Sequence, residues 1–272
     1  VCNIGLAPLF IFVFDCGIKG AAWATVLSQS VTLVWVIHHF LNKKSTVHFT
    51  RNYWRMNTRI IMDIFSIGMA PFLVNVCACV IVIVINNTLK SHGGDLAIGA
   101  YGIINRLLTL YVMIVLGLTM GMQPISGYNY GAGKIQRVHR TLKLGIISGV
   151  AITTSGFLLS ELLPRAIASM FTDSKELIDI ASPGLRIAAI VFPLVGSQIV
   201  ITNFFQSIGK VKISIFLSLC RQMVYLLPAL LILPGRYGIT GVWASMPVSD
   251  FLAFVTAWIA LLFYFRSVKS KA

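Results

Sequence analysis

The stretch GVWASMPVSDFLAFVTAWIALLFY, residues 241–264, contains a single charged side chain, that of Asp250. A helix of about 20 predominantly apolar residues is long enough to cross the hydrocarbon core of a bilayer. Inside that core no water can bond the backbone, so each N–H and C=O group needs a partner within its own segment. The stretch therefore predicts a transmembrane helix.

The rest of the chain repeats this pattern. Hydrophobic residues make up 57% of the 272 residues and charged residues only 11%, whereas soluble domains carry about 25% charged residues. An apolar segment, Ile4–Phe14, is too short to span a bilayer. Six further spans are predicted near residues 21–41, 60–86, 97–122, 144–163, 184–205 and 213–233. The fold class is thus an all-α integral membrane protein, a polytopic helical bundle.

The basic residues indicate how the chain is oriented. The net charge is +14, but the basic residues sit in short gaps between apolar runs and form no single polar face, so we expect no nucleic-acid partner. Fourteen of the 22 lysines and arginines fall in the gaps 42–59, 123–143 and 206–212 and in the tail 265–272; five fall in the opposite gaps. The positive-inside rule then predicts a multi-pass plasma-membrane protein with a cytoplasmic C-terminus.

The sequence offers no catalytic or metal chemistry. The five cysteines lie in or beside apolar runs, and Cys77 and Cys79 would point about 200° apart on a helix. No phosphate-binding loop, nucleophile elbow or pair of catalytic carboxylates is found. We expect neither an enzyme nor a resident cofactor.

Two stretches resemble each other. Residues 17–25 read GIKGAAWAT and residues 238–245 read GITGVWAS, and each opens a predicted span on the outer side. Read as a parallel repeat, a known transporter architecture, the similarity predicts six plus six helices. The first five helices would precede Val1, so we expect a longer protein with a further N-terminal lobe.

Several motifs resemble the multidrug and toxic compound extrusion (MATE) family, with the MepA-like bacterial branch as the best match. The main one is QPISGYNYGAG at residues 123–133. The others are Asn3-Ile4 with Pro8–Phe12, Ser66-Ile67-Gly68 with Pro71, Ala100–Ile103 with Arg106, Asn203–Lys210, Arg221-Gln222, and Gly241-Val242-Trp243 with Pro247 and Asp250.

The resemblance implies two six-helix lobes around a central cavity and alternating access. Residues 1–41 would end the N-terminal lobe, 42–59 would form a cytoplasmic linker, and 60–272 would form the complete C-terminal lobe. The implied activity is export of small amphipathic or cationic drugs, coupled to a proton or sodium gradient. A lipid-linked oligosaccharide flippase of related architecture and an intramembrane enzyme are the alternatives.

The coupling site is not expected in this part of the protein. The sodium-coupled branch carries acids in its seventh and tenth helices, here 60–86 and 184–205. The only acid in either is Asp63, at an edge. We therefore expect the coupling cation to bind in the missing first lobe.

Polar residues deep in the spans are the candidates for a substrate or ion cavity. Charges there cost roughly 2.5–3.5 kcal/mol on insertion scales, so they usually face a cavity or a partner. The candidates are Asn75, Tyr101, Asn105, Arg106, Gln198, Gln206, Arg221, Tyr225 and Asp250. Packing between helices through hydrogen bonds is the structural alternative for each of them.

Depth along the spans suggests specific ion pairs. Arg106 and Asp250 each lie nine residues from the outer end of a span, about 13–14 Å deep, and we predict that they pair. Arg221, the rival partner of Asp250, is offset from it by roughly 9 Å of helix height. Nearer the outer surface, Glu161 and Arg165 have the i, i+4 order of an ion pair.

The charge asymmetry makes a testable prediction about topology. Single cysteines at Ser45 and Ser270, in a cysteine-free background, should resist an impermeant thiol reagent in intact cells, because both are predicted to be cytoplasmic. Labelling after permeabilisation is the positive control. Ready labelling of both positions in intact cells would contradict the orientation.

Overall fold

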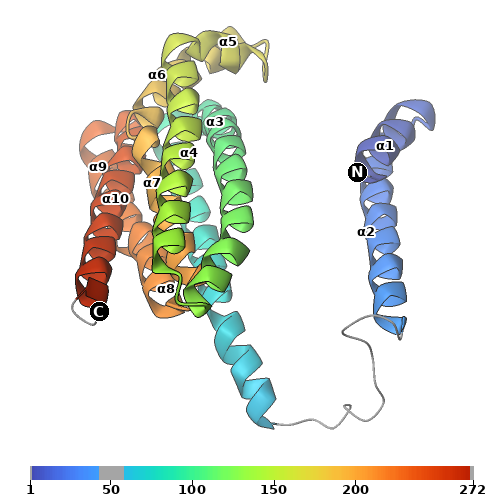
Figure 1. Ribbon diagram of the computed structural model, residues 1–272. Coiled ribbons are helices and arrows are strands. Elements are labelled where there is room, and N and C mark those ends of the chain that lie inside the picture. The colour runs from blue at the N-terminus through green and yellow to red at the C-terminus, as the bar shows by residue number, and fades with distance from the viewer. Residues whose placement is uncertain (1, 43–57, 270–272) are drawn as a thin grey trace. The chain divides into compact units, whose positions relative to one another are not determined.

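The computed structural model describes residues 2–42 and 58–269, and every regular element in them is a helix (Figure 1). The all-α fold class is therefore confirmed. The described chain divides into two compact units, residues 1–64 and 65–272. The predicted linker, 42–59, and the end of the C-terminal tail lie almost wholly outside the described residues.

The first unit is a helical hairpin. The helix α1 (Cys2–Pro8) continues as the π-helical segment η1 (Leu9–Val13), and the chain then reverses into α2 (Gly17–Leu41). The reversal uses positive φ angles at Asp15 (52°) and Gly17 (51°). The expected short apolar segment and the expected first span are both present.

The second unit contains the rest of the helices. A long helix, α3 (Thr58–Gly131), runs into it, and α4 (Ile135–Leu162) follows. The helices α5 (Pro164–Ser169), α6 (Lys175–Ala189), α7 (Phe192–Ser207) and α8 (Val211–Leu219) come next. The π-helical segment η3 (Cys220–Leu226), α9 (Leu227–Tyr237) and α10 (Ile239–Lys269) complete it.

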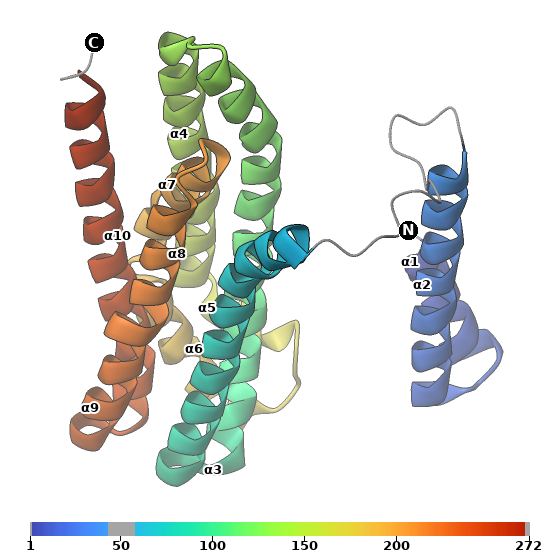
Figure 2. The same ribbon diagram turned by 90° about the horizontal axis from the view of Figure 1, so that it is seen from below.

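One glycine divides α3 into two arms. Gly94 has φ 65° and ψ −161°, which is not helical, and glycine reaches that region without a steric penalty. Figure 2 shows the chain turning back there, so that the two arms lie side by side. The arms correspond to the predicted spans 60–86 and 97–122.

All seven predicted spans have a counterpart among the described residues. By length and composition, five described helices could cross a membrane, and the pair α6 and α7 could form a sixth span. This count takes α3 as one helix, so dividing it at Gly94 gives seven. The predicted span 184–205 was wrong in one respect, because it is not a continuous helix. α6 and α7 meet at 53°. Pro193 is the cause: it lacks an N–H, and its ring would clash with the carbonyl of Ala189 if the helix continued.

The QPISGYNYGAG motif is more helical than expected. It begins the predicted gap 123–143 between two spans, but α3 continues to Gly131. The chain turns only at 132–134, where Gly133 has φ 69°.

The helices α4 and α7 pack through small residues. A Cβ atom added to Gly196 on α7 would collide with the backbone carbonyl of Gly149 on α4. Gly145, Thr153 and Gly156 extend the buried small-residue stripe along α4, and the Thr153 hydroxyl lies 3.2 Å from the carbonyl of Pro193, at the helix break. Small residues let helix backbones approach closely in lipid, where packing replaces the hydrophobic effect between helices.

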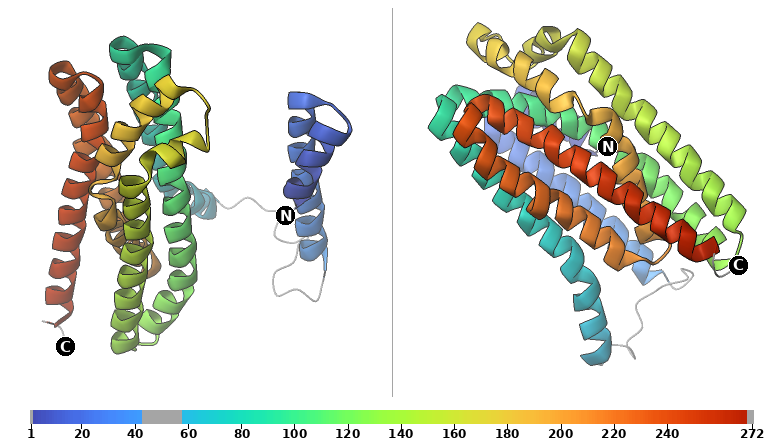
Figure 3. Two further views of the ribbon diagram at one scale, coloured as in Figure 1. Left: turned by 90° about the horizontal axis from the view of Figure 1, so that it is seen from above. Right: turned by 90° about the vertical axis from the view of Figure 1, so that its left-hand side faces the viewer.

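Large side chains fill the space on either side of this contact. Phe204 and Phe205 on α7 are fully buried, and they pack in one cluster with residues of α3, α4, α8 and α10. A second cluster joins the two arms of α3 to α6, α9 and α10. In Figure 3 the long helices of this unit run roughly alongside one another.

The two repeated stretches use their glycines in the same way. Gly17 and Gly238 both turn the chain with positive φ, 51° and 58°. A second glycine follows three residues after each of these. A Cβ added to Gly20 would collide with the backbone carbonyl of Phe10, and a Cβ added to Gly241 would collide with that of Leu233. Each pair thus starts a helix and packs it closely on the helix before.

Replacing Gly196 with alanine should destabilise the second unit by about 1–3 kcal/mol, because the new methyl group overpacks a backbone contact. Denaturing-detergent titration of the purified protein measures this loss. The matched control is Gly117→Ala, where the new Cβ has no neighbour within 4 Å; alanine favours a helix over glycine there. Equal stability of the two variants would contradict the close α4–α7 contact.

Candidate functional site

The centre of the candidate site is an ion pair between η3 and α10. The Nε of Arg221 lies 2.7 Å from Oδ1 of Asp250, and the two side chains are 34% and 10% exposed. Both residues lie within helices apolar enough to cross a membrane. A hydrogen-bonded opposite charge offsets much of the cost of burying either group.

The predicted partner of Asp250 was wrong. Arg106 lies exposed on the second arm of α3, and among the described residues no ion pair with Arg106 is found. The depth argument failed because it compared backbone positions only. An arginine side chain is long enough to span several residues of helix height, and it can lean along the helix axis.

A second polar contact shows this leaning directly. The hydroxyl of Tyr225 lies 2.7 Å from Oγ1 of Thr256. The chain reverses between α9 and α10 at Gly238, so these elements are antiparallel. If side chains did not lean, a residue further back along η3 would contact a residue further on along α10. Arg221 contacts Asp250 while Tyr225 contacts Thr256, which means that the two long side chains reach in opposite directions along the axis.

The remaining candidates do not gather at this pair. Tyr101 is buried and stacks on Trp243, with ring centroids 6.4 Å apart. Gln198 is buried on α7, and its backbone carbonyl accepts a hydrogen bond from the Thr202 hydroxyl. The other four candidates are exposed; they are Asn75, Asn105, Arg106 and Gln206.

Three buried polar atoms have no hydrogen-bond partner among the described residues. One is Oε1 of Gln222, the residue that follows Arg221 in η3. The other two, Ser126 Oγ and Asn129 Oδ1, belong to the QPISGYNYGAG motif. Gln123, the first residue of that motif, donates to Oδ1 of Asn203 on α7 at 3.4 Å. Sequence reasoning missed Gln222 and Thr256 as site neighbours, because neither carries a charge and a mid-span amide or hydroxyl is common in packed membrane helices.

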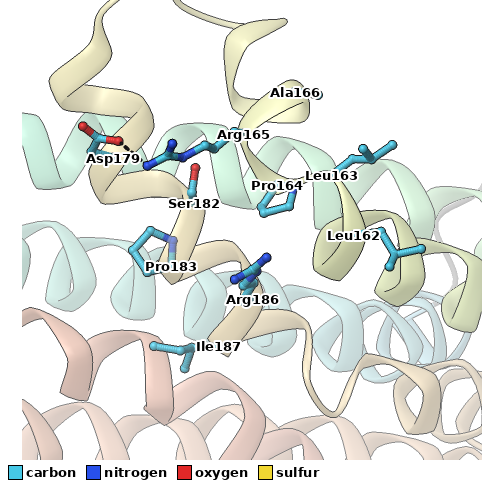
Figure 4. Close-up of a pocket in the computed structure, with 10 residues that line it drawn as sticks. All are labelled: Leu162, Leu163, Pro164, Arg165, Ala166, Asp179, Ser182, Pro183, Arg186 and Ile187. Atoms are coloured by element: carbon cyan, nitrogen blue, oxygen red, sulfur yellow. Dashed lines mark hydrogen bonds and ion pairs between the residues drawn. The ribbon is translucent and has the colours of Figure 1, made fainter.

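A pocket of about 640 Å³, lined mostly by apolar side chains and by four polar ones, lies at the end of the bundle where α4, α5 and α6 meet (Figure 4). The guanidinium of Arg165 lies 3.2 Å from Asp179, and that of Arg186 lies 3.7 Å from Glu161. The expected Glu161–Arg165 pair was therefore wrong, since the chain leaves the α4 helix before Arg165. All four side chains are about half exposed or more, and such surface pairs add little stability.

The fold and the buried pair define a class: a multi-pass α-helical membrane protein whose spans carry a paired charge. Comparison with known families makes this specific. The MatE family model matches residues 66–231, and the chain belongs to this family of transporters, which are not enzymes. The resemblance drawn from the sequence is confirmed.

Individual relatives agree with this assignment. The chain is 28% identical over its whole length to the multidrug export protein MepA of Staphylococcus saprophyticus, and it covers 60% of that protein. It is 27% identical over 94% of its length to MepA of Staphylococcus aureus, covering 56%. The chain therefore spans about three fifths of the length of the curated relatives it matches.

Solved structures show the same fold. One is a ligand complex of the MATE multidrug transporter DinF-BH, with a TM-score of 0.82 and 34% identity; the match covers 97% of this chain and 59% of that one. Another is an outward-facing MATE transporter of the MOP superfamily, with a TM-score of 0.85 and 22% identity, covering 99% and 61%.

The ion pair makes a prediction about stability. Arg221→Gln alone should lower the free energy of unfolding by about 3–5 kcal/mol, because it leaves the buried carboxylate of Asp250 unpaired. Asp250→Asn alone should cost less, because the Arg221 side chain is 34% exposed. The double variant should lose clearly less than the sum. Denaturing-detergent titrations of all three measure the coupling.

The matched control is Arg106→Gln, which should show no coupling to Asp250→Asn in the same titrations, because the described residues hold no ion pair between Arg106 and Asp250. Strictly additive losses at 221 and 250 would contradict the pair. A coupling between 106 and 250 would instead restore the pairing predicted from sequence.

Proposed function

We propose that this chain forms part of a multidrug exporter and supplies one of its two lobes. The supporting observation is the family match over residues 66–231, together with relatives named as multidrug export proteins. Small amphipathic or cationic drugs are the proposed substrates. A plasma-membrane location with a cytoplasmic C-terminus follows from the positive-inside rule.

The proposed mechanism is alternating access by rocking of two lobes, with the cavity between them. The close contact of Gly149 with Gly196 supports it, because tightly packed helices move as one body. The break at Pro193 is a place where the second unit can bend, since irregular helix geometry often marks a functional hinge.

We assign the driving cation, a proton or sodium, to a site in the other lobe. Within the described spans Asp250 is the buried carboxylate, and its Oδ1 is already held by Arg221 at 2.7 Å. A carboxylate engaged in this way is poorly available to a passing cation. In this proposal the pair keeps η3 fixed against α10 while the lobes move.

A lipid-linked oligosaccharide flippase of related architecture is the weaker alternative. A flippase for a large anionic substrate would be expected to carry more charge in its cavity. The relatives reported above are named for multidrug export instead, and this favours drugs as the substrates.

An export assay tests the proposal. The full-length protein, expressed in a drug-hypersensitive strain, should restore ethidium efflux, and dissipating the proton or sodium gradient should abolish it. Residues 1–272 alone should insert into the membrane without restoring efflux, because one lobe supplies only one wall of the cavity.

Efflux by the inserted chain alone would contradict the two-lobe proposal. Translocation of lipid-linked oligosaccharide in reconstituted vesicles, with no drug export, would favour the flippase. Membrane insertion of each form is checked by detecting a C-terminal tag in washed membranes.

A further inference from the structure

A pocket of about 370 Å³ lies between α4 and α10, away from the ion pair. This volume falls in the range of small-molecule sites, about 300–1,000 Å³. Its walls are apolar apart from two residues at one end. The lining residues are His139, Leu142, Lys143, Ile146, Ile147, Trp258, Leu261 and Phe265.

The floor of the pocket is buried and its rim is exposed. Leu142 and Leu261 are buried, at 3% and 2% exposure, whereas Ile147 is 55% exposed. Trp258 is turned inward, with its indole N–H 3.4 Å from the Ser197 hydroxyl. An apolar surface of this kind on a membrane-spanning bundle faces acyl chains, and a pocket in it accepts one of them.

The polar end of the pocket is basic. His139 and Lys143 are four residues apart on α4, so they are neighbours on one face. The His139 ring also packs edge-on against Phe265, with centroids 4.7 Å apart, which fixes it beside the pocket. An ammonium group and imidazole N–H groups are donors suited to phosphate oxygens.

The surrounding charge has one sign. Three exposed arginines lie close in sequence to the residues that line the pocket: Arg137, Arg140 and Arg266. No acidic residue occurs between positions 96 and 160 or after Asp250. The first turns of α4 and the last turns of α10 lie at the same end of the bundle (Figures 1 and 3). That end is cytoplasmic in the predicted topology, where anionic lipids gather and each nearby cation contributes about 1 kcal/mol to their attraction.

We propose that this pocket is a binding site for an anionic phospholipid, with one acyl chain against Trp258 and Ile146 and the phosphate on Lys143 and His139. The site is separate from the proposed drug cavity, and it requires only that the chain spans a membrane. A bound lipid would join the ends of α4 and α10, whereas the Ser197–Trp258 contact joins α10 to α7.

Native mass spectrometry of the full-length protein, released from nanodiscs of phosphatidylglycerol and phosphatidylcholine, tests the site. Wild type should retain phosphatidylglycerol preferentially. The double substitution His139→Gln/Lys143→Gln should lower that retention about fivefold or more, as expected for the loss of one or two cations near the headgroup. Lys143→Arg should keep it, because the charge is kept.

The matched control is Arg137→Gln, which removes a cation from the same end of α4 but points about 200° away from His139 around the helix. It should lower retention clearly less than the double substitution does, because it removes only part of the diffuse attraction and no group of the proposed site. Ile147→Trp tests the acyl part separately, because it fills the apolar pocket and should reduce retention without changing any charge.

Equal loss in the Arg137→Gln variant would overturn the proposal and leave only diffuse attraction of anionic lipid to a basic surface. Equal retention of phosphatidylcholine and phosphatidylglycerol by wild type would also overturn it. All the substituted side chains are partly or fully exposed, so the variants should fold, and the unfolding midpoint of each is measured alongside.

Discussion

Hydrocarbon solvent imposes the constraint on which this structure depends. Within it the backbone must bond to itself, which makes each span a helix, and two apolar helices gain little from leaving lipid for one another. Association must then come from close contact, and the meeting of Gly149 with Gly196 supplies it. With α4 and α7 in backbone contact, Phe204 and Phe205 can fill the space on either side. The position of α6 follows, since it is joined to α7 across the bend at Pro193.

The same solvent makes a charge expensive unless it is paired. Arg221 and Asp250 satisfy each other, and Tyr225 and Thr256 form a second polar contact between the same elements. These contacts hold a π-helical segment against α10, in a part of the bundle where the regular helical ladder is interrupted. Family membership indicates that such a bundle serves transport. The paired charges indicate that η3 and α10 stay together during it.

Several features of the fold could be predicted from residues alone. The apolar runs located every span, because a stretch such as 241–264 has no other stable place than a bilayer. The glycines of the two repeated stretches marked helix starts, and the structure gives them matching conformations. Other features required local rules that the apolar pattern hides. Pro193 breaks a helix within a long apolar run, and Tyr128–Tyr130 are helical although they lie in a predicted gap between spans.

The sequence by itself determined that this is a membrane bundle, which segments span it, and that Arg106, Arg221 and Asp250 needed explaining, because composition and the cost of buried charge act locally. Only the tertiary structure decided that Asp250 forms its ion pair with Arg221 and that Arg106 forms none among the described residues. Depth along a helix is a one-dimensional measure, whereas pairing depends on which helices are neighbours and on how far a long side chain leans. The pocket between α4 and α10 was equally hidden, since its walls lie more than a hundred residues apart in the chain and meet only through packing.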